Sequence, residues 1–225
     1  MTKDPYRSAR RRLVSEIARA VPGCDPRVLE AMARIPRHRF VEEAFWPRAY
    51  ADQALPIGYG QTISRPSTVA RMTSALALSP ADRVLEVGTG SGYQTAVLAC
   101  LAGRVFSVER VAALAVRARA RLDRLGLTGV EIRPGDGALG WPERAPFDAV
   151  LVTAAASEIP GALLEQLAPG GRLVIPVGDG DRQAILRIQR GPSGGWTREV
   201  LEPCRFVPLR TGPLQAPAGT GSKAW

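Results

Sequence analysis

The sequence predicts an α/β protein with a mostly parallel, twisted β-sheet, helices on both faces and a helical N-terminal extension. From Arg83 onward, short β-rich runs alternate with helical segments, as in right-handed βαβ units. The first of these runs, residues 83–87, ends directly at a glycine-rich turn. Ligands of such sheets bind beyond the carboxyl ends of the strands, where the strand order reverses. The segment after Val87 is therefore the first candidate for a functional site.

The N-terminal part is predicted to be helices and turns. Val14, Ile17, Ala18 and Val21 recur at helical spacing, and Asp25 followed by proline is typical of a helix start. Residues 55–60 are rich in turn formers, and a further helix is expected at about residues 66–78. We assign residues 1–80 to an extension that contributes the acceptor site.

The remaining elements follow from the alternation. Strands are expected at residues 83–87, 105–108, 130–132, 147–152 and 172–177, and helices at 93–102, 111–125 and 160–167. Two later apolar runs, residues 184–188 and 200–207, predict a terminal hairpin through the turn at 191–195. Residues 81–211 would form the core. Residues 212–225, rich in Gly, Pro, Ala and Ser, would form a flexible tail.

Composition excludes several classes of protein. The 225 residues are 45% hydrophobic and 23% charged, which is ordinary globular composition. The longest apolar runs are far shorter than the roughly 20 residues that a membrane-spanning helix needs. Cys24, Cys100 and Cys204 are odd in number and widely spaced, so we expect neither a disulfide framework nor a metal site. No apolar run follows the basic N-terminus, so we expect no signal peptide and a cytoplasmic protein.

A net charge of +9 raises the question of a nucleic-acid partner. The thirty basic residues include only Lys3 and Lys223 as lysines, an arginine excess that GC-rich codon usage produces by itself. The densest clusters, within residues 7–12 and 117–124, are not interleaved with aromatic residues as base-stacking surfaces are. We expect solvated helix faces, no nucleic-acid partner and a monomer.

The glycine turn after Val87 permits a sharp bend and a close approach of a ligand. Gly88, Gly90 and Gly92 occupy alternate positions. The dinucleotide fingerprint requires glycine at position 93, which is tyrosine, and no phosphate-binding P-loop follows. An ordinary strand-to-helix turn stays open as the alternative.

Acidic residues at neighbouring strand ends make the ligand more specific. Glu109 ends the second strand, where a carboxylate can accept hydrogen bonds from ribose hydroxyls. Asp136 follows the third strand and could receive the amine of an adenine, with Glu86 near the turn. Alternatively, Glu109 is an exposed charge beside Arg110 and Asp136 a turn residue. Together the three loops predict a nucleoside ligand without pyrophosphate, which S-adenosyl-L-methionine fits best.

The chain resembles the protein-L-isoaspartate (D-aspartate) O-methyltransferases over about residues 31–209. The segments that carry the resemblance are residues 35–41, 49–50, 55–66, 85–94, 146–148, 152–155, 170–178 and 206–209. The run Gly60-Gln61-Thr62-Ile63-Ser64 is specific to this family, whereas the glycine turn is shared by methyltransferases at large. The resemblance implies the Rossmann-like fold of S-adenosylmethionine-dependent methyltransferases.

The resemblance also implies an activity. Enzymes of this family methylate the free α-carboxylate of L-isoaspartyl, and possibly D-aspartyl, residues in damaged proteins or peptides, and the ester then collapses to a succinimide. Ser64 matches the active-site serine of the family. The expected cofactor contacts are Ile63, Ser64, Glu86, Gly88, Thr89, Gly90, Gly92, Glu109, Arg110, Asp136 and Gly137. Arg65 stands where glutamine is common and Ser67 where an aromatic residue often follows the proline, which leaves substrate preference open.

The chemistry agrees with a carboxylate acceptor. A carboxylate with a pKa near 4 is ionised at neutral pH and needs positioning rather than a general base. The single histidine, His38, is expected to be buried and structural, and Arg37 to be a solvated surface residue. Ser64 would donate a hydrogen bond to the acceptor oxygen, the alternative being that it caps the helix starting near Pro66.

Three other functions are open at this point. The same fold could esterify aspartate in a dedicated precursor peptide, or it could bind the cofactor without catalysis. A nucleic-acid methyltransferase is a third possibility. The Asn-Pro-Pro-aromatic motif that methylates base amines is missing, because Val152-Thr153-Ala154-Ala155 occupies that position.

Overall fold

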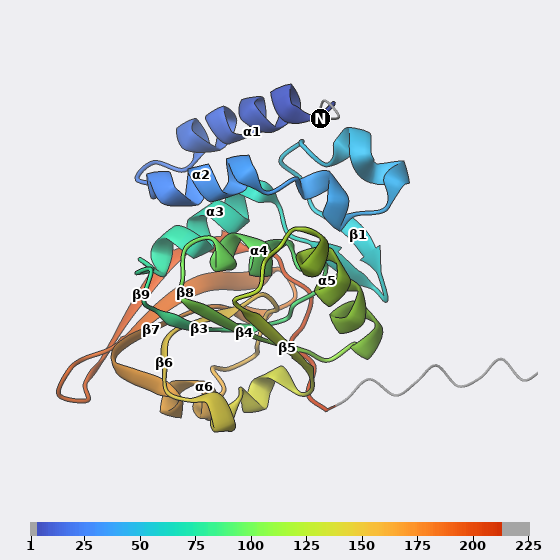
Figure 1. The fold of residues 1–225 in the computed structure, drawn as a ribbon. Helices are drawn as coiled ribbons and strands as arrows, with labels where there is room; N and C mark the ends of the chain where they lie inside the picture. Colours follow the sequence, from blue (N-terminus) through green and yellow to red (C-terminus); the bar gives the residue numbers. More distant parts are fainter. Residues whose placement is uncertain (1–3, 213–225) are drawn as a thin grey trace, which may run out of the picture.

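The structure, a computed structural model, describes residues 4–212 (Figure 1). Its centre is a seven-stranded sheet in the order β5-β4-β3-β6-β7-β8-β9. The strands are β3 (Arg83–Val87), β4 (Arg104–Glu109), β5 (Val130–Pro134), β6 (Phe147–Val152), β7 (Leu167–Asp179), β8 (Arg182–Arg190) and β9 (Trp196–Cys204). Strands β3 to β7 pair in parallel, and β8 and β9 pair antiparallel. The predicted α/β fold and the terminal hairpin are confirmed.

The order of the strands reverses between β3 and β6. From β3 the chain moves outward to β4 and β5, and then returns to the other side of β3 for β6 and β7. The carboxyl ends of β3 and β6 therefore face a crevice with crossovers on either side, which is the usual ligand position in open parallel sheets.

Helices cover both faces of the sheet, because parallel strands joined by crossovers bury both of their faces. The helices α4 (Tyr93–Ala99) and α5 (Ala112–Arg124) lie on one face, and α6 (Gly161–Glu165) lies on the other with the short helices η3 (Gly137–Leu139) and η4 (Pro142–Arg144) (Figure 1). Alternation along β3 shows the consequence: Val84 packs in the cluster on the α4 side and Leu85 in the cluster on the α6 side.

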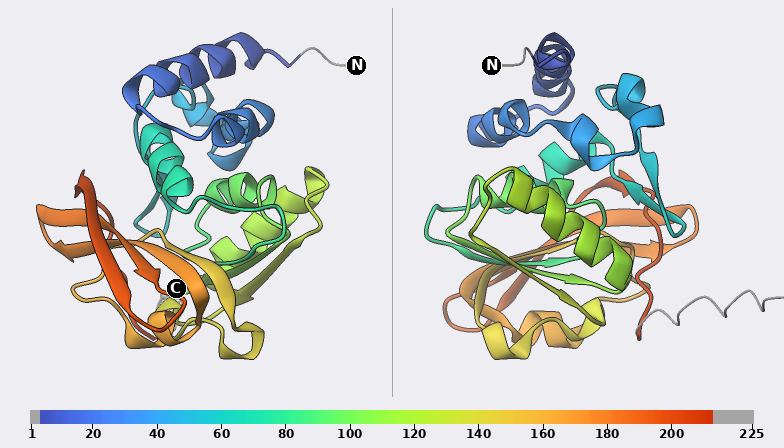
Figure 2. Two further views of the ribbon diagram at one scale, coloured as in Figure 1. Left: turned by 90° about the vertical axis from the view of Figure 1, so that its left-hand side faces the viewer. Right: turned by 45° about the vertical axis from the view of Figure 1, so that its right-hand side comes forward.

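The N-terminal helices form an additional layer above α4 (Figure 2). They are α1 (Arg7–Ala20), α2 (Pro26–Arg34), η1 (Arg37–Phe40), η2 (Glu43–Arg48) and α3 (Pro66–Ala75). As expected, Asp25 caps α2: its side chain accepts a hydrogen bond from the backbone N–H of Arg27. Leu13 and Ile17 of α1 belong to the same buried cluster as Val84, so the layer packs continuously onto the sheet.

Two elements differ from the sequence prediction. The turn-rich segment forms a small hairpin, β1 (Leu55–Gly58) and β2 (Gln61–Ile63), in which Leu55 pairs with Ile63. Strand β7 also begins earlier than predicted, so that Pro169 and the glycines after it belong to the strand rather than to the end of a helix. The early part of the strand pairs with β6, through Leu167 and Phe147, whereas pairing with β8 begins at Arg172.

Of the predicted tail, only Gly212 belongs to the described residues. Within residues 4–212, every helix is too short or too polar to cross a bilayer.

Candidate active site

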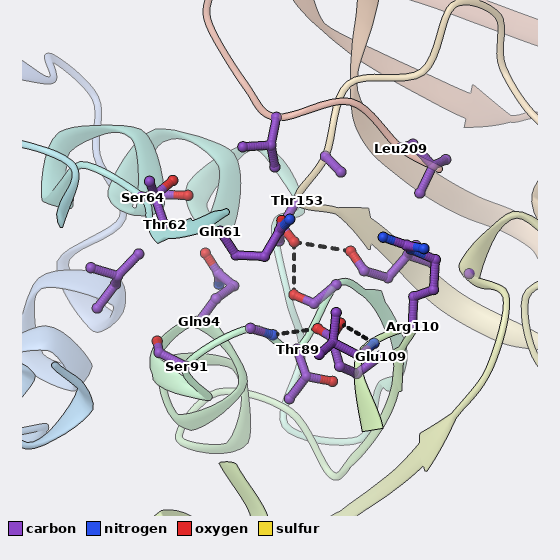
Figure 3. Close-up of a pocket in the computed structure, with 18 of the residues that line it drawn as sticks. Gln61, Thr62, Ser64, Thr89, Ser91, Gln94, Glu109, Arg110, Thr153 and Leu209 are labelled. Atoms are coloured by element: carbon purple, nitrogen blue, oxygen red, sulfur yellow. Dashed lines mark hydrogen bonds between the residues drawn. The ribbon is translucent and has the colours of Figure 1, made fainter. Parts of the chain in front are cut away.

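A pocket opens beyond the carboxyl ends of β3, β4 and β6, where the strand order reverses (Figure 3). Most of its walls come from the β1–β2 hairpin, the glycine turn, the ends of β4 and β6, and the segment after β9. The lining residues are Gln61, Thr62, Ile63, Ser64, Val69, Val87, Gly88, Thr89, Gly90, Ser91, Tyr93, Gln94, Val108, Glu109, Arg110, Val111, Gly137, Thr153, Ala154, Val207, Pro208, Leu209 and Arg210. Most of the predicted contact residues lie here, and Glu86, Gly92 and Asp136 do not.

Glu109 ties the end of β4 to the glycine turn. Its Oε2 accepts a hydrogen bond from the backbone N–H of Gly90 at 2.7 Å, and its Oε1 accepts one from the N–H of Val111 at 2.8 Å (Figure 3). Each carboxylate oxygen has two lone pairs, so both retain acceptor capacity toward the pocket. The carboxylate can therefore hold the turn and receive a pair of hydroxyl groups from a ligand.

Gly88 allows another part of the protein, rather than a ligand, to approach the turn closely. Its φ is +96°, and a Cβ there would lie 2.3 Å from Thr153 Oγ1. That hydroxyl donates to the carbonyls of Val87 at 3.0 Å and Gly88 at 2.7 Å, which joins the end of β6 to the turn. Glycine at this position lets two neighbouring strand ends meet under the pocket.

Two residues predicted as cofactor contacts serve the interior instead. A Cβ on Gly92 would meet the Cβ of Ala118 at 3.1 Å, so this glycine lets α4 pack against α5. Glu86 is fully buried on the α4 side of β3, because the alternation along the strand directs it away from the crevice. The structure does not place Glu86 in the pocket.

The Glu86 carboxyl belongs to a buried chain of hydroxyl groups. Thr95 and Ser107 donate to its Oε2 at 2.5 and 2.6 Å, and Ser107 is 2.6 Å from the hydroxyl of Thr89 in the glycine turn. Its Oε1 is buried without a partner among the described residues. Burial raises the pKa of Glu86 to about 8, and the charge of Glu109 adds to this while the two hydrogen bonds oppose it.

Asp136 is also absent from the lining of the pocket. Its Oδ1 accepts from the N–H of Ala138 at 2.9 Å, which caps η3, and its Oδ2 accepts from the N–H of Gly212 at 2.6 Å. The turn role that the sequence left as an alternative is thus what the structure shows for this carboxylate. Gly137 lines the pocket in its place.

Ser64 lies where two cavities meet. Together with Thr62, Thr153 and Val207, it lines both the pocket over the strand ends and an adjoining cleft toward α3 and β9. The alternative role as a helix cap is wrong: the N-cap of α3 is Arg65, and no side chain caps this helix. Within residues 4–212 the Ser64 hydroxyl makes no hydrogen bond, so it is available to a ligand in the cleft.

Arg65 and Ser67, which follow the serine, share one partner. Asp52 accepts from Arg65 Nη2 at 3.2 Å, from the N–H of Ser67 at 2.8 Å and from the Ser67 hydroxyl at 2.7 Å. Burial raises the pKa of Asp52, but these hydrogen bonds outweigh it and hold the pKa below its ordinary value. The carboxylate therefore fixes the backbone on both sides of Pro66, immediately after Ser64.

Comparison with known protein families identifies the family of this chain. The family model for protein-L-isoaspartate(D-aspartate) O-methyltransferases matches residues 9–213. The chain belongs to this family. A protein-L-isoaspartate O-methyltransferase of Trichlorobacter lovleyi is 55% identical over 203 residues, covering 89% of this chain and 93% of its own. One of Pseudomonas paraeruginosa is 59% identical over 189 residues, covering 84% of this chain and 89% of its own.

Solved structures of the family share the fold. One protein-L-isoaspartate O-methyltransferase superposes with a TM-score of 0.81 at 28% identity, covering 88% of this chain and 65% of its own. A putative one from Plasmodium falciparum, in complex with S-adenosyl-L-homocysteine, gives a TM-score of 0.79 at 27% identity, covering 90% of this chain and 99% of its own.

The pocket of this methyltransferase fits S-adenosylmethionine. The carboxylate of Glu109 faces it from the end of β4, with Gly90 and Thr89 beside it (Figure 3). Tyr93, fully buried, stands where the dinucleotide fingerprint has its last glycine, so the turn does not have the pattern that approaches a pyrophosphate. A single nucleoside with a sulfonium matches these groups better than a dinucleotide does.

Several lining residues of the enzyme were missed from the sequence. Gln61 and Thr62 belong to the family-specific run, which was the available signal for them. Thr153 and the segment 207–209 were noticed only as part of the resemblance, and Arg210 was not noticed at all. That segment reaches the pocket because Ala155 donates to the carbonyl of Val207 and accepts from the N–H of Leu209.

The two residues that precede Phe40 are both buried. His38 is structural, as predicted, with Nδ1 2.7 Å from the hydroxyl of Tyr50. The expectation that Arg37 is solvated is wrong: the side chain is 1% exposed and donates to the carbonyls of Ala49 and Gln53. Burial lowers the pKa of Arg37 to about 10.

Proposed function

We propose that this chain transfers the methyl group of S-adenosyl-L-methionine to the free α-carboxylate of L-isoaspartyl residues in damaged proteins. The observation that carries the proposal is the position of Ser64, whose side chain lines both the pocket and the cleft. A donor held at Glu109 and an acceptor held at Ser64 would meet at this junction. The names of the relatives support the isoaspartyl acceptor.

The chain's own residues act by positioning. When bound, S-adenosylmethionine supplies an electrophilic methyl group. The acceptor carboxylate is already ionised at neutral pH, so no side chain has to remove a proton from it. The Ser64 hydroxyl would donate a hydrogen bond to one acceptor oxygen and turn the other toward the pocket. Val87, Val108 and Leu209 line the pocket and would exclude water from it.

We also propose which part of the chain binds the acceptor and which part binds the cofactor. Residues 1–80 would supply the acceptor side through Ser64, and residues 81–211 would hold the cofactor at Glu109. We also propose a monomer in the cytoplasm that does not bind nucleic acid. In support of the last point, many arginines are already engaged, such as Arg172 with Asp82 and Arg71 with Glu202.

The test is transfer of labelled methyl from S-adenosylmethionine to an isoaspartyl peptide and to its normal aspartyl twin, with methanol release followed at mildly alkaline pH. We expect labelling of the isoaspartyl peptide alone. Equal labelling of both peptides would favour a peptide-tailoring enzyme, and cofactor binding without any base-labile ester would favour a non-catalytic protein.

Substitution of Ser64, compared with substitution of an exposed serine, tests the role of Ser64 in the reaction. Ser64→Ala removes one directed hydrogen bond to the acceptor and should lower turnover about a hundredfold, with cofactor affinity unchanged. Ser15→Ala, at an exposed position of α1, is the control and should keep full activity. Full activity of Ser64→Ala would remove this residue from the mechanism.

A further inference from the structure

A third cavity lies at the C-terminal end of α5, outside the pocket and cleft described above. It has a volume of about 280 Å³ and is lined by Arg39, Trp46, Arg121, Arg124 and Leu125. Arg39 comes from η1 and Trp46 from η2, while the other three come from the last turn of α5 and its C-cap. Three of its five lining side chains are thus cationic.

These three cations lack acidic partners. Within residues 4–212, none of Arg39, Arg121 and Arg124 forms an ion pair, although arginines elsewhere in the chain commonly do. Arg121 donates one hydrogen bond, from Nη1 to the carbonyl of Ser91 at 3.1 Å. Each guanidinium carries five N–H donors, so the cavity walls hold a large surplus of donors and of positive charge.

Arg121 is the least exposed of the three arginines, and neighbouring positive charges lower its pKa. Burial lowers the pKa of Arg121, and repulsion from Arg117 and Arg124 lowers it further. Glu42 acts in the opposite direction but does not come within ion-pair distance. Bringing like charges around the half-buried guanidinium of Arg121 is unfavourable unless an anion neutralises them.

The indole of Trp46 supplies an apolar wall of the cavity. Its Nε1 is buried and has no hydrogen-bond acceptor among the described residues. The ring packs edge-on against His38 and Tyr6, which fixes its position. Because this nitrogen is fully buried, the ring rather than the N–H group lines the cavity.

The C-terminal dipole of α5 accounts for only part of this arrangement. Arg121 and Arg124 in the last turn of a helix interact favourably with its carbonyl end. Arg39 belongs to a different element, so the dipole of α5 does not explain its place at the cavity, whereas an acceptor-rich anion in the cavity does.

We propose that this cavity binds a small phosphate compound with several negative charges, of the pyrophosphate class. Three guanidinium groups match about three negative charges, whereas a single carboxylate would leave most of the positive charge uncompensated. Arginine also presents its donors in the planar fork that suits phosphate oxygens. The site is independent of the methyl-transfer reaction proposed above.

The test is calorimetric titration of the full chain with inorganic pyrophosphate at low, constant ionic strength. We expect saturable binding at one site. The double variant Arg39→Gln/Arg124→Gln changes two exposed side chains and should weaken binding at least about tenfold. The control Arg11→Gln/Arg19→Gln removes the same charge from two exposed, unpaired positions of α1 and should bind as the unaltered chain does.

Circular dichroism of each variant shows whether it is folded. Equal weakening in both double variants, or no saturable binding to the unaltered chain, would overturn the proposal. A poly-glutamate peptide provides a further test. If it binds with the same dependence on the arginines while pyrophosphate does not bind, the proposal is also overturned, because the partner would then be an acidic protein segment.

Discussion

The buried carboxyl of Glu86 should make the stability of this protein depend on pH, and Glu86→Gln should remove that dependence. In the folded chain, burial raises the pKa of Glu86 to about 8, whereas its ordinary value is 4.5. Between these two values the folded state binds more protons than the unfolded state. Stability from this group is therefore fully present below about pH 4.5 and is lost as the pH rises toward 8.

The magnitude follows from the difference between the two pKa values. Each pH unit in this interval corresponds to roughly 1.4 kcal/mol. Between pH 5.5 and 7.5 the unaltered protein should lose on the order of 3 kcal/mol relative to Glu86→Gln. Glutamine keeps an oxygen for the hydroxyls of Thr95 and Ser107, so the buried chain of hydrogen bonds stays in place.

The measurement is urea unfolding of both proteins at half-unit steps from pH 5.5 to 9. The difference between their free energies of unfolding should fall steadily up to about pH 8 and then level off. Other titrating groups, such as His38, cancel because both proteins contain them. Titration with S-adenosyl-L-homocysteine at pH 7 should give similar affinities, because Glu86 lies outside the pocket.

A pH-independent difference would contradict the buried, neutral state of this carboxyl. A large loss of cofactor affinity in Glu86→Gln, with stability unchanged, would return Glu86 to the role of cofactor contact that the sequence suggested.

Three further substitutions test the site. Gly88→Ala places a Cβ 2.3 Å from Thr153 Oγ1 at a φ of +96°, and should cost about 2–3 kcal/mol of unfolding free energy, whereas Gly161→Ala, with open space around it, should cost little. Asp52→Asn weakens the anchoring of the backbone after the active-site serine and should raise KM for an isoaspartyl peptide several-fold while cofactor affinity stays constant in calorimetry. Glu109→Gln replaces one acceptor of two charge-assisted hydrogen bonds and should lower affinity for S-adenosyl-L-homocysteine at least about tenfold; unchanged affinity would exclude Glu109 from the cofactor site.

The parallel core could be predicted because its strands are apolar and end at clear breaks. Residues 147–152 form β6 with the predicted bounds, since both faces of a central parallel strand are buried. The β1–β2 hairpin was missed because proline and glycines interrupt its alternation, and only pairing between Leu55 and Ile63 reveals it.

The site residues that lie at the ends of strands could be predicted, because the ends of the strands could be predicted. Glu109 and Gly90 follow strand ends, so their position in the crevice is a consequence of topology. Glu86 precedes the end of its strand, and its side-chain direction depends on which face the alternation gives it. Asp136 follows a strand as expected, but its two oxygens are used by local N–H groups and by Gly212, a contact that sequence spacing does not encode.

The pocket draws its walls from opposite ends of the polypeptide. The β1–β2 hairpin supplies Gln61 and Ile63, while Val207 and Leu209 are held in place by backbone hydrogen bonds with Ala155. During synthesis, the sheet from β3 to β7 can assemble while the C-terminal part is still inside the ribosomal tunnel. The pocket is complete only when residue 209 has emerged, so a nascent chain can be largely folded before its pocket has all of its walls.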